Sequence, residues 1–139
     1  MNTKYHIYSF EKLEVYKNAL LYSVEIRDVV SYFPKSEEYK LTRQLEKSVD
    51  SISSNLAEGS GRASNNDQAH FTNMAFGSAL ESINHLNLAL LLKYIKEDRY
   101  TQLRLDMDKI ISQLNALYRY QVNNSPTLKT KVKRQTLND

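Results

Sequence analysis

A glutamate and a histidine four positions apart are the first residues whose types could hold a metal ion. Glu81 and His85 have this spacing, which places both on one face of a helix. The di-iron sites of helical bundles need Glu-x-x-His pairs on two helices together with two further glutamates. His6 and His70 complete no such set, and no histidines have the spacing of zinc proteases. We therefore expect no metal site and no cofactor.

Hydroxyl-rich and glycine-rich segments offer two other kinds of chemistry, and both are incomplete. Serines recur at Ser51, Ser53 and Ser54. A serine nucleophile needs an adjacent base, and no His–Asp pattern accompanies these residues. The segment Gly59-Ser60-Gly61-Arg62 is shorter than a phosphate-binding loop, and such loops follow a strand. The sequence therefore predicts no catalytic residues, and we expect that the protein is not an enzyme.

Basic residues are the remaining candidates for binding, and their distribution along the chain is uneven. The net charge is +3, from 19 Lys and Arg against 16 Asp and Glu. The segment after residue 123 holds four of these basic residues and one of the acidic residues, so residues 1–123 hold 15 of each. Cationic side chains bind nucleic acid through its phosphates. The candidate nucleic-acid contacts are Arg43, Lys47, Arg62, Lys129, Lys131, Lys133 and Arg134.

Helices must position these residues, because the composition disfavours other elements. The chain has 139 residues, of which 3 are Gly and 2 are Pro, and this scarcity of turn formers favours long helices. Apolar residues at helical spacing predict four helices, over residues 10–33, 37–58, 64–94 and 98–122. We expect Ser36 and Ser64 to cap the second and third helices. We expect Gly59 and Gly61 to end the second helix in the left-handed conformation.

Four long helices with short connections predict an all-α fold, an antiparallel up-down-up-down four-helix bundle. The bundle domain is expected over residues 1–123, and residues 124–139 are expected to form a basic, disordered tail. No run of about 18 apolar residues that could span a membrane occurs in the sequence. The chain has no cysteine and begins with a polar segment. We therefore expect a cytoplasmic protein without a membrane partner, and we identify no small-molecule substrate.

The third predicted helix differs from the others because it is almost uncharged. Between Gln68 and Leu92 the single formally charged residue is Glu81. A surface helix of a monomeric bundle has one apolar stripe and a charged opposite face. Here the apolar residues predict two packing faces, one within the bundle and one against a second copy of the chain. In the alternative interpretation, its Ser, Thr, Asn, Gln and His residues form an adequately polar face. In the first helix, Leu20 and Val24 belong to a single apolar stripe.

A glycine in the middle of the third helix indicates a close helix contact. Gly77 costs about 1 kcal/mol relative to alanine, and the close approach of another helix would compensate for this cost. If the second and third helices form an antiparallel hairpin that turns near Arg62, Ser48 and Ser51 lie opposite Gly77 and Ala75.

The same register makes a prediction about the one charged residue of the third helix. It places Glu81 near Arg43 or Lys47. We therefore predict that Glu81 forms a structural ion pair and is not a catalytic carboxylate.

The segment from Ser51 to Ser64 reads SISSNLAEGSGRAS. It resembles the signature S-I-x-x-N-[IL]-A-E-G-x-G-R-x-S of a bacterial four-helix-bundle family, which is encoded in intervening sequences of 23S ribosomal RNA genes. Other segments between residues 10 and 120 are similar to the same family, among them Phe33-Pro34-Lys35 and Tyr94-Ile95. The residues that match the motifs of the family are Asn55, Glu58, Gly59, Gly61, Arg62, Gly77, Ser78 and Glu81.

The resemblance implies a left-handed four-helix bundle that often forms a ring-shaped homopentamer. It also implies kinship with the accessory variability protein of diversity-generating retroelements, a positively charged pentamer that works with a reverse transcriptase and nucleic acid. Two functions are open for the present chain. The first is a homo-oligomer that binds structured RNA or RNA–DNA, and the second is a protein-interaction scaffold without nucleic acid. The basic tail is accordingly either a nucleic-acid arm or a solvated terminus.

Overall fold

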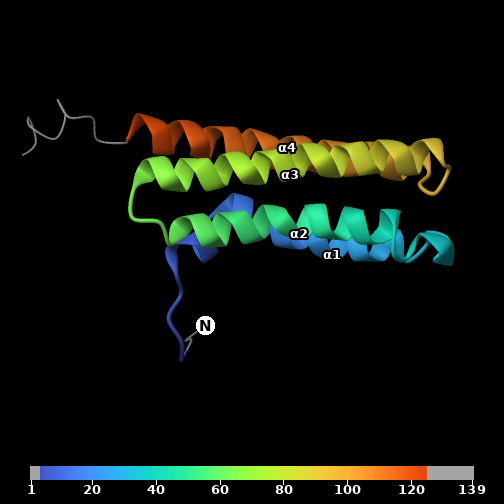
Figure 1. Cartoon of the computed structure of the whole chain (residues 1–139), viewed down its shortest axis with the longest axis horizontal. Coiled ribbons are helices and arrows are strands. Elements are labelled where there is room, and N and C mark those ends of the chain that lie inside the picture. The colour runs from blue at the N-terminus through green and yellow to red at the C-terminus, as the bar shows by residue number, and fades with distance from the viewer. Residues whose placement is uncertain (1–3, 125–139) are drawn as a thin grey trace, which may run out of the picture.

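A computed structural model describes residues 4–124, which form four long helices joined by short connections (Figure 1). The α-helices are α1 (Glu14–Val30), α2 (Leu41–Ser60), α3 (Asn65–Leu91) and α4 (Glu97–Asn123), and the short 3₁₀ helices are η1 (Ser9–Lys12) and η2 (Lys35–Glu37). The α-helices contact one another in the order α1–α2–α3–α4–α1, and within residues 4–124 neither diagonal pair is in contact. The predicted all-α, antiparallel four-helix bundle is therefore confirmed.

Aliphatic side chains from all four helices form the core. The largest of the fully buried side chains are Ile26, Leu45, Ile52, Leu86, Leu103, Met107, Ile110 and Leu114. Together with the smaller buried residues, they give each helix a buried stripe with a spacing of three or four residues, as the seam of a bundle requires. None of the helices in residues 4–124 has the length and hydrophobicity that crossing a lipid bilayer would demand.

Serine side chains join α2 to α3 within this bundle. The hydroxyl of Ser82 donates to Oγ of Ser48 over 2.9 Å, and the hydroxyl of Ser78 donates to Oγ of Ser51, also over 2.9 Å. Hydroxyl pairs of this kind let two helices meet without leaving buried polar atoms unsatisfied. They also report the register of the hairpin, because each pair marks two residues at the same height.

The observed register differs from the predicted one by about one helical turn. Ser78 and Ser82, not Gly77 and Ala75, lie opposite the two serines of α2. Gly77 is exposed, and a Cβ atom there would meet no atom within 4 Å, so the predicted close contact at this glycine is wrong. The difference arises because α2 continues through Gly59, which moves the reversal of the chain to a later residue.

The close approach of α2 and α3 occurs at Gly59 instead. A Cβ atom at this position would lie 2.6 Å from Cβ of Phe71, a distance that real side chains do not adopt. Gly59 lies inside α2, and Gly61 at its end has a φ of −82°. Neither glycine adopts the left-handed conformation predicted for it. The requirement for glycine at residue 59 is therefore steric rather than conformational.

The starts of α1 and α2 also differ from the predictions. The predicted helix over residues 10–33 is divided, because Leu13 is extended (φ −69°, ψ 129°) and α1 begins only at Glu14. Ser36 lies within η2 and does not cap α2, which begins at Leu41.

The ends of α3 show one agreement and one difference. Ser64 caps α3 as predicted, since the N–H of Asp67 donates to its Oγ over 3.1 Å. The helix ends at Leu91 rather than Tyr94, because Lys93 has a φ of 63° and this left-handed conformation stops the helix.

An ion pair at the surface joins α1 to α2. The guanidinium of Arg27 donates to both carboxylate oxygens of Asp50, over 2.9 and 2.7 Å. This fork-to-fork geometry is the strong form of the arginine–carboxylate contact. The hydrogen bond from Arg27 is the main reason why the pKa of Asp50 lies below its ordinary value.

We predict that Gly59→Ala destabilises the fold. Forcing a methyl group against Phe71 costs about 1–3 kcal/mol, and this cost outweighs the helix propensity that alanine gains, about 1 kcal/mol. Gly61→Ala is the matched control, because its Cβ would lie no closer than 3.5 Å to the carbonyl oxygen of Glu58. Urea unfolding followed by circular dichroism measures both variants. Equal midpoints for the two variants would contradict the close approach.

We also predict that Asp50→Asn weakens the dependence of stability on acid pH. Since Arg27 lowers the pKa of folded Asp50, their pairing stabilises the fold above about pH 4, the ordinary pKa of aspartate. That stabilisation is lost as the pH falls through the lowered pKa. Urea midpoints between about pH 6 and pH 2 should therefore fall less in the variant than in the natural chain. Asp108→Asn, at an exposed residue without an ion pair among residues 4–124, should leave the slope unchanged.

Candidate functional site

Two of the predicted nucleic-acid contacts share one exposed side of α2. Arg43 and Lys47 are four residues apart, and both are exposed. Among residues 4–124, no carboxylate lies within 4.0 Å of their charged nitrogens. We call these two residues the α2 cation pair. Their charges are thus available to a phosphate group.

The α2 cation pair borders an open surface groove of about 580 Å³. Three carboxylates also line this groove, those of Glu38, Glu46 and Asp50. Arg27 contacts two of them, at 2.7 Å from Asp50 and 3.9 Å from Glu46. The groove is thus lined by three cations and three carboxylates and has no net charge, and the α2 cation pair lies on the part of it where no ion pair forms among the described residues.

Arg62, the third predicted contact in the described chain, lies at the other end of α2 and has structural partners. Its guanidinium lies 3.3 Å from a carboxylate oxygen of Glu58 and 4.5 Å from the centre of the Phe71 ring. The structure therefore does not bring Arg62 together with the α2 cation pair. The four predicted contacts of the tail, Lys129, Lys131, Lys133 and Arg134, lie outside the described residues.

The other residues of the signature segment hold the α2–α3 hairpin together. The side-chain amide of Asn55 donates to the carbonyl oxygen of Ser51 over 2.8 Å and to its Oγ over 3.0 Å. Ser51 in turn accepts from Ser78 on α3. With Gly59 packed beneath Phe71, these contacts give the segment a structural role, which sequence reasoning did not assign.

Glu81 contacts a histidine and not a basic residue of α2. One of its carboxylate oxygens lies 3.5 Å from Nε2 of His85, on the next turn of α3. Glu81 and Lys47 border the same surface groove, but neither Lys47 nor Arg43 comes within 4.0 Å, so the predicted ion pair is wrong. The shifted register of α2 against α3 accounts for this difference. Within residues 4–124, no third side chain joins Glu81 and His85 to complete a metal site.

The outward side of α3 exposes large apolar side chains. The exposed fractions are 43% for Met74, 47% for Leu80, 45% for Leu88 and 79% for Leu91. Gly77 lies among them, with open space where a side chain would be. We call these five residues the α3 outer face. An exposed glycine within a helix lowers stability by about 1 kcal/mol and brings no packing inside this chain.

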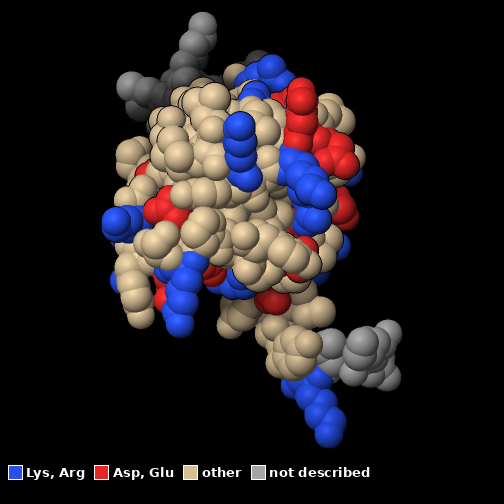
Figure 2. Space-filling view, turned by 90° about the vertical axis from the view of Figure 1, so that its right-hand side faces the viewer, with Lys and Arg blue, Asp and Glu red and all other residues tan. Residues whose placement is uncertain are grey.

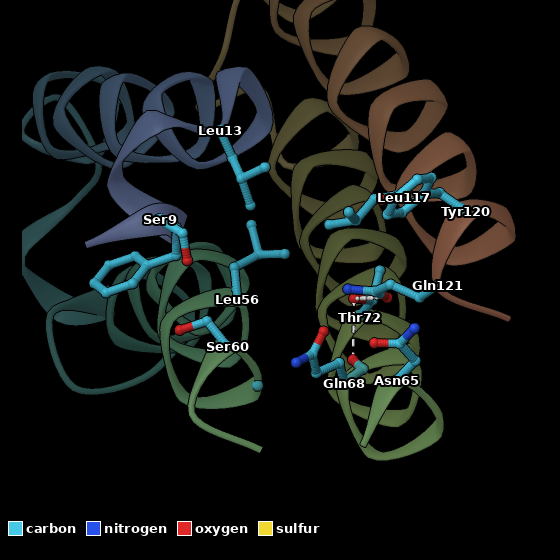
Figure 3. A pocket seen from close by; sticks show the side chains of 12 residues that line it. Ser9, Leu13, Leu56, Ser60, Asn65, Gln68, Thr72, Leu117, Tyr120 and Gln121 are labelled. Carbon is cyan, nitrogen blue, oxygen red and sulfur yellow. Dashed lines mark hydrogen bonds between the residues drawn. The ribbon is translucent and has the colours of Figure 1, made fainter. Parts of the chain in front are cut away.

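A cavity of about 410 Å³ opens at the end of the bundle where α2 meets the start of α3 (Figure 3). Beside the hydroxyl, amide and aliphatic groups that line it, the hydroxyl of Thr72 donates to the side chain of Gln121 over 2.7 Å. At its rim, the amide of Asn65 donates to the carbonyl oxygen of Asn124, the last described residue, over 3.0 Å. The lining holds no carboxylate, imidazole, amine or thiol. Of the side-chain types that commonly act as general acids or bases, this lining contains only a tyrosine, Tyr120.

The opposite end of the bundle has charges of both signs. The α1–α2 and α3–α4 connections place cations and carboxylates there, at Lys35, Lys40, Lys93 and Lys96 and at Glu37, Glu38, Glu97 and Asp98. Figure 2 shows basic and acidic side chains interspersed around a largely uncharged surface. This end is therefore not a continuous basic patch.

Comparisons with known proteins agree with this architecture. Residues 11–116 match the family described as 23S rRNA-intervening sequence protein. A solved structure with a similar fold is a protein of unknown function from the S23 ribosomal protein family of Bacteroides thetaiotaomicron. Its TM-score is 0.70 at 23% identity, and the match covers 76% of this chain and 95% of that chain. No curated protein matches the sequence.

The family match contains α1, α2 and α3, extends to residue 116 within α4, and includes the hairpin that Gly59, Asn55 and Arg62 build. The match therefore covers most of the bundle and contains the signature segment from Ser51 to Ser64. We conclude that the chain belongs to the 23S rRNA-intervening sequence protein family.

Proposed function

We propose that this protein is a non-enzymatic homo-oligomer that binds nucleic acid, either structured RNA or RNA–DNA. The observation that carries the proposal is the α3 outer face, whose exposed apolar side chains include Met74 and Leu80 on either side of the exposed Gly77. Five copies form the assembly, the number that the family resemblance implies. The cytoplasm, where structured RNA is abundant, is the compartment in which we propose that it acts.

The physical argument for assembly rests on the cost of leaving this surface in water. Burying apolar surface is favourable by about 25 cal/mol for each Å² removed from water. Leu80, Leu88 and Leu91 are thus available to stabilise a contact with another copy. Gly77 would let the backbone of a partner helix approach closely. Glycine is unfavourable inside a helix, and contact with a partner would compensate for this cost, whereas the single chain offers no such contact.

The argument for nucleic acid rests on repetition of the α2 cation pair. Within residues 4–124 of one copy, Arg43 and Lys47 are neighbouring cations that form no ion pair, and residues 1–123 have no net charge. A closed assembly repeats Arg43 and Lys47 once per copy, so a modest local charge becomes a ring of charges. Phosphates that bind such a ring release condensed counterions, and the affinity therefore falls steeply with salt.

The second candidate function is a protein-interaction scaffold that binds no nucleic acid. The observation that favours it is the balance of charge, because basic and acidic side chains alternate at the end of the bundle shown in Figure 2. Both functions use the same assembly. They differ in whether a polyanion binds to it, and the second experiment below separates them.

We predict that Leu80→Glu together with Leu88→Glu dissociates the assembly without unfolding the chain. Each substitution places a charge in the proposed contact, where it would lose its hydration. Multi-angle light scattering should show a multiple of 16.2 kDa for the natural chain and a single chain for the variant. Ser112→Glu with Ala116→Glu, on the exposed side of α4, adds the same charge and should keep the full mass. A natural chain with the mass of one copy would refute the assembly.

We predict that Arg43→Gln together with Lys47→Gln weakens RNA binding and its dependence on salt. The probe is a fluorescently labelled RNA hairpin, titrated by anisotropy between about 50 and 200 mM salt. Each lost phosphate contact should reduce the salt slope by about one. Lys109→Gln with Arg119→Gln removes the same charge from α4, the helix diagonal to α2, and should have little effect. If the intact assembly does not bind this RNA at low salt, the scaffold function is the correct one.

A further inference from the structure

The cavity at the end of the bundle where α2 meets α3 (Figure 3) exists because α1 is short. Helix α1 has 17 residues, whereas α3 and α4 have 27 each, and η1 with the extended Leu13 precedes α1 at this end. The ends of α2, α3 and α4 therefore border a space that α1 does not fill. Its volume of about 410 Å³ lies in the range of pockets that hold small molecules, about 300–1,000 Å³.

The side chains that line this cavity carry no formal charge. Leu13, Leu56 and Leu117 contribute aliphatic surface, and the other lining side chains are hydroxyl, amide and aromatic groups. A phosphate, a carboxylate or an ammonium group would lose its hydration here, and no opposite charge among the lining residues would compensate for that loss. The part of a ligand that enters the cavity must therefore be uncharged.

Two amide side chains of α3 offer acceptor oxygens to such a ligand. Asn65 and Gln68 both line the cavity, and they are neighbours on the helix surface because they are three residues apart. The amide nitrogen of Asn65 donates to the carbonyl oxygen of Asn124, and that of Gln68 donates to the carbonyl oxygen of Arg62, each over 3.0 Å. Because these bonds use the nitrogens and fix both amides, the two oxygens remain as acceptors.

A third amide of the lining is held by a buried hydroxyl. Thr72 is only 2% exposed, and its hydroxyl donates to the side-chain oxygen of Gln121 over 2.7 Å. This bond joins α3 to α4 and fixes the orientation of the Gln121 amide. Hydrogen bonds within the chain thus hold the polar groups of the cavity in place before a ligand arrives, which lowers the entropic cost of binding.

Neighbouring acceptor oxygens beside apolar surface fit a nucleobase with an exocyclic amino group. Such a group carries two N–H donors on the edge of a flat, uncharged ring, and asparagine and glutamine are the side chains that commonly bind the amino group of adenine. A keto oxygen in place of the amino group would face the oxygens of Asn65 and Gln68 without a donor. The exposed hydroxyls of Ser9 and Ser60, which also line the cavity, suit the hydroxyls of a ribose.

We propose that this cavity binds a nucleoside whose base carries an exocyclic amino group, through the side-chain oxygens of Asn65 and Gln68. The ligand is a free nucleoside or one unpaired nucleotide of an RNA. The site is separate from the α2 cation pair, because Ser60 is the last residue of α2 and Arg43 lies in its first turn. It requires neither that pair nor the proposed assembly.

Isothermal titration calorimetry with matched nucleosides tests this site. Adenosine should bind about tenfold more tightly than inosine, in which an oxygen replaces the amino group, because one good contact at a base edge discriminates by about this factor. Cytidine and uridine form a second such pair. Since these nucleosides carry no phosphate, their affinities should not change between about 50 and 200 mM salt, unlike the affinity of RNA for the α2 cation pair.

Two substitutions of Gln68 separate contact with the ligand from a structural role. Gln68→Leu removes the acceptor and should abolish the preference for the amino base. Gln68→Glu loses the hydrogen bond to Arg62 but keeps an oxygen that accepts from the amino group, so it should retain the preference. Gln44→Leu, at an exposed glutamine in the first turn of α2, should leave binding unchanged. Circular dichroism establishes that each variant is folded.

A short oligoadenylate, compared with the matching oligoinosinate, distinguishes the two sources of the base. Binding of free adenosine indicates a nucleoside site, whereas the same preference in the oligonucleotides alone indicates a nucleotide of an RNA. The proposal is overturned if amino and keto bases bind equally, or if neither form binds. It is also overturned if both variants of Gln68 lose the preference or both retain it. None of these results decides the proposed assembly, which light scattering tests separately.

Discussion

The contact between Phe71 and the bare backbone at Gly59 determines how closely α2 and α3 approach. With a side chain at residue 59 the helices would have to move apart, and the hydroxyl pairs between them would lengthen. The same ring lies beneath the guanidinium of Arg62, which closes the hairpin. The signature segment of the family therefore acts first as a structural element. It sets the geometry of the two helices that carry the α2 cation pair and the α3 outer face.

Part of the local structure was predictable, whereas the cap at Ser36 and the left-handed ends at Gly59 and Gly61 were predicted wrongly. Helix number, helix type and the Ser64 cap follow from spacing and from residues close together in the chain. The register of α2 against α3 was not, because it depends on the contact of Gly59 with a residue twelve positions away on another helix. The predicted ion pair of Glu81 with Arg43 or Lys47 was wrong because it was derived from the same incorrect register.

The candidate surfaces show the same limit. Spacing alone placed Arg43 and Lys47 on one side of a helix, and the uncharged third helix indicated an exposed apolar face. The exposure of Leu20 and Val24 on α1 was not predicted, because the apolar stripe of α1 is wide enough that its periodicity does not show which edge is buried. Exposed large apolar residues occur on the outer sides of α1, α3 and α4, whereas α2 carries the α2 cation pair on its exposed side.

The hydrogen bond between Asn65 and the carbonyl oxygen of Asn124 fixes where the chain leaves the bundle. Its exit lies beside the α2–α3 turn, at the same end in every copy. A cyclic assembly of parallel copies would therefore have two unlike rims. All carboxyl-terminal extensions, with their surplus of lysine and arginine, would start from one rim, and the opposite rim would display the mixed charges of the other turns. Such a ring is polar, so a ligand could distinguish its two entrances.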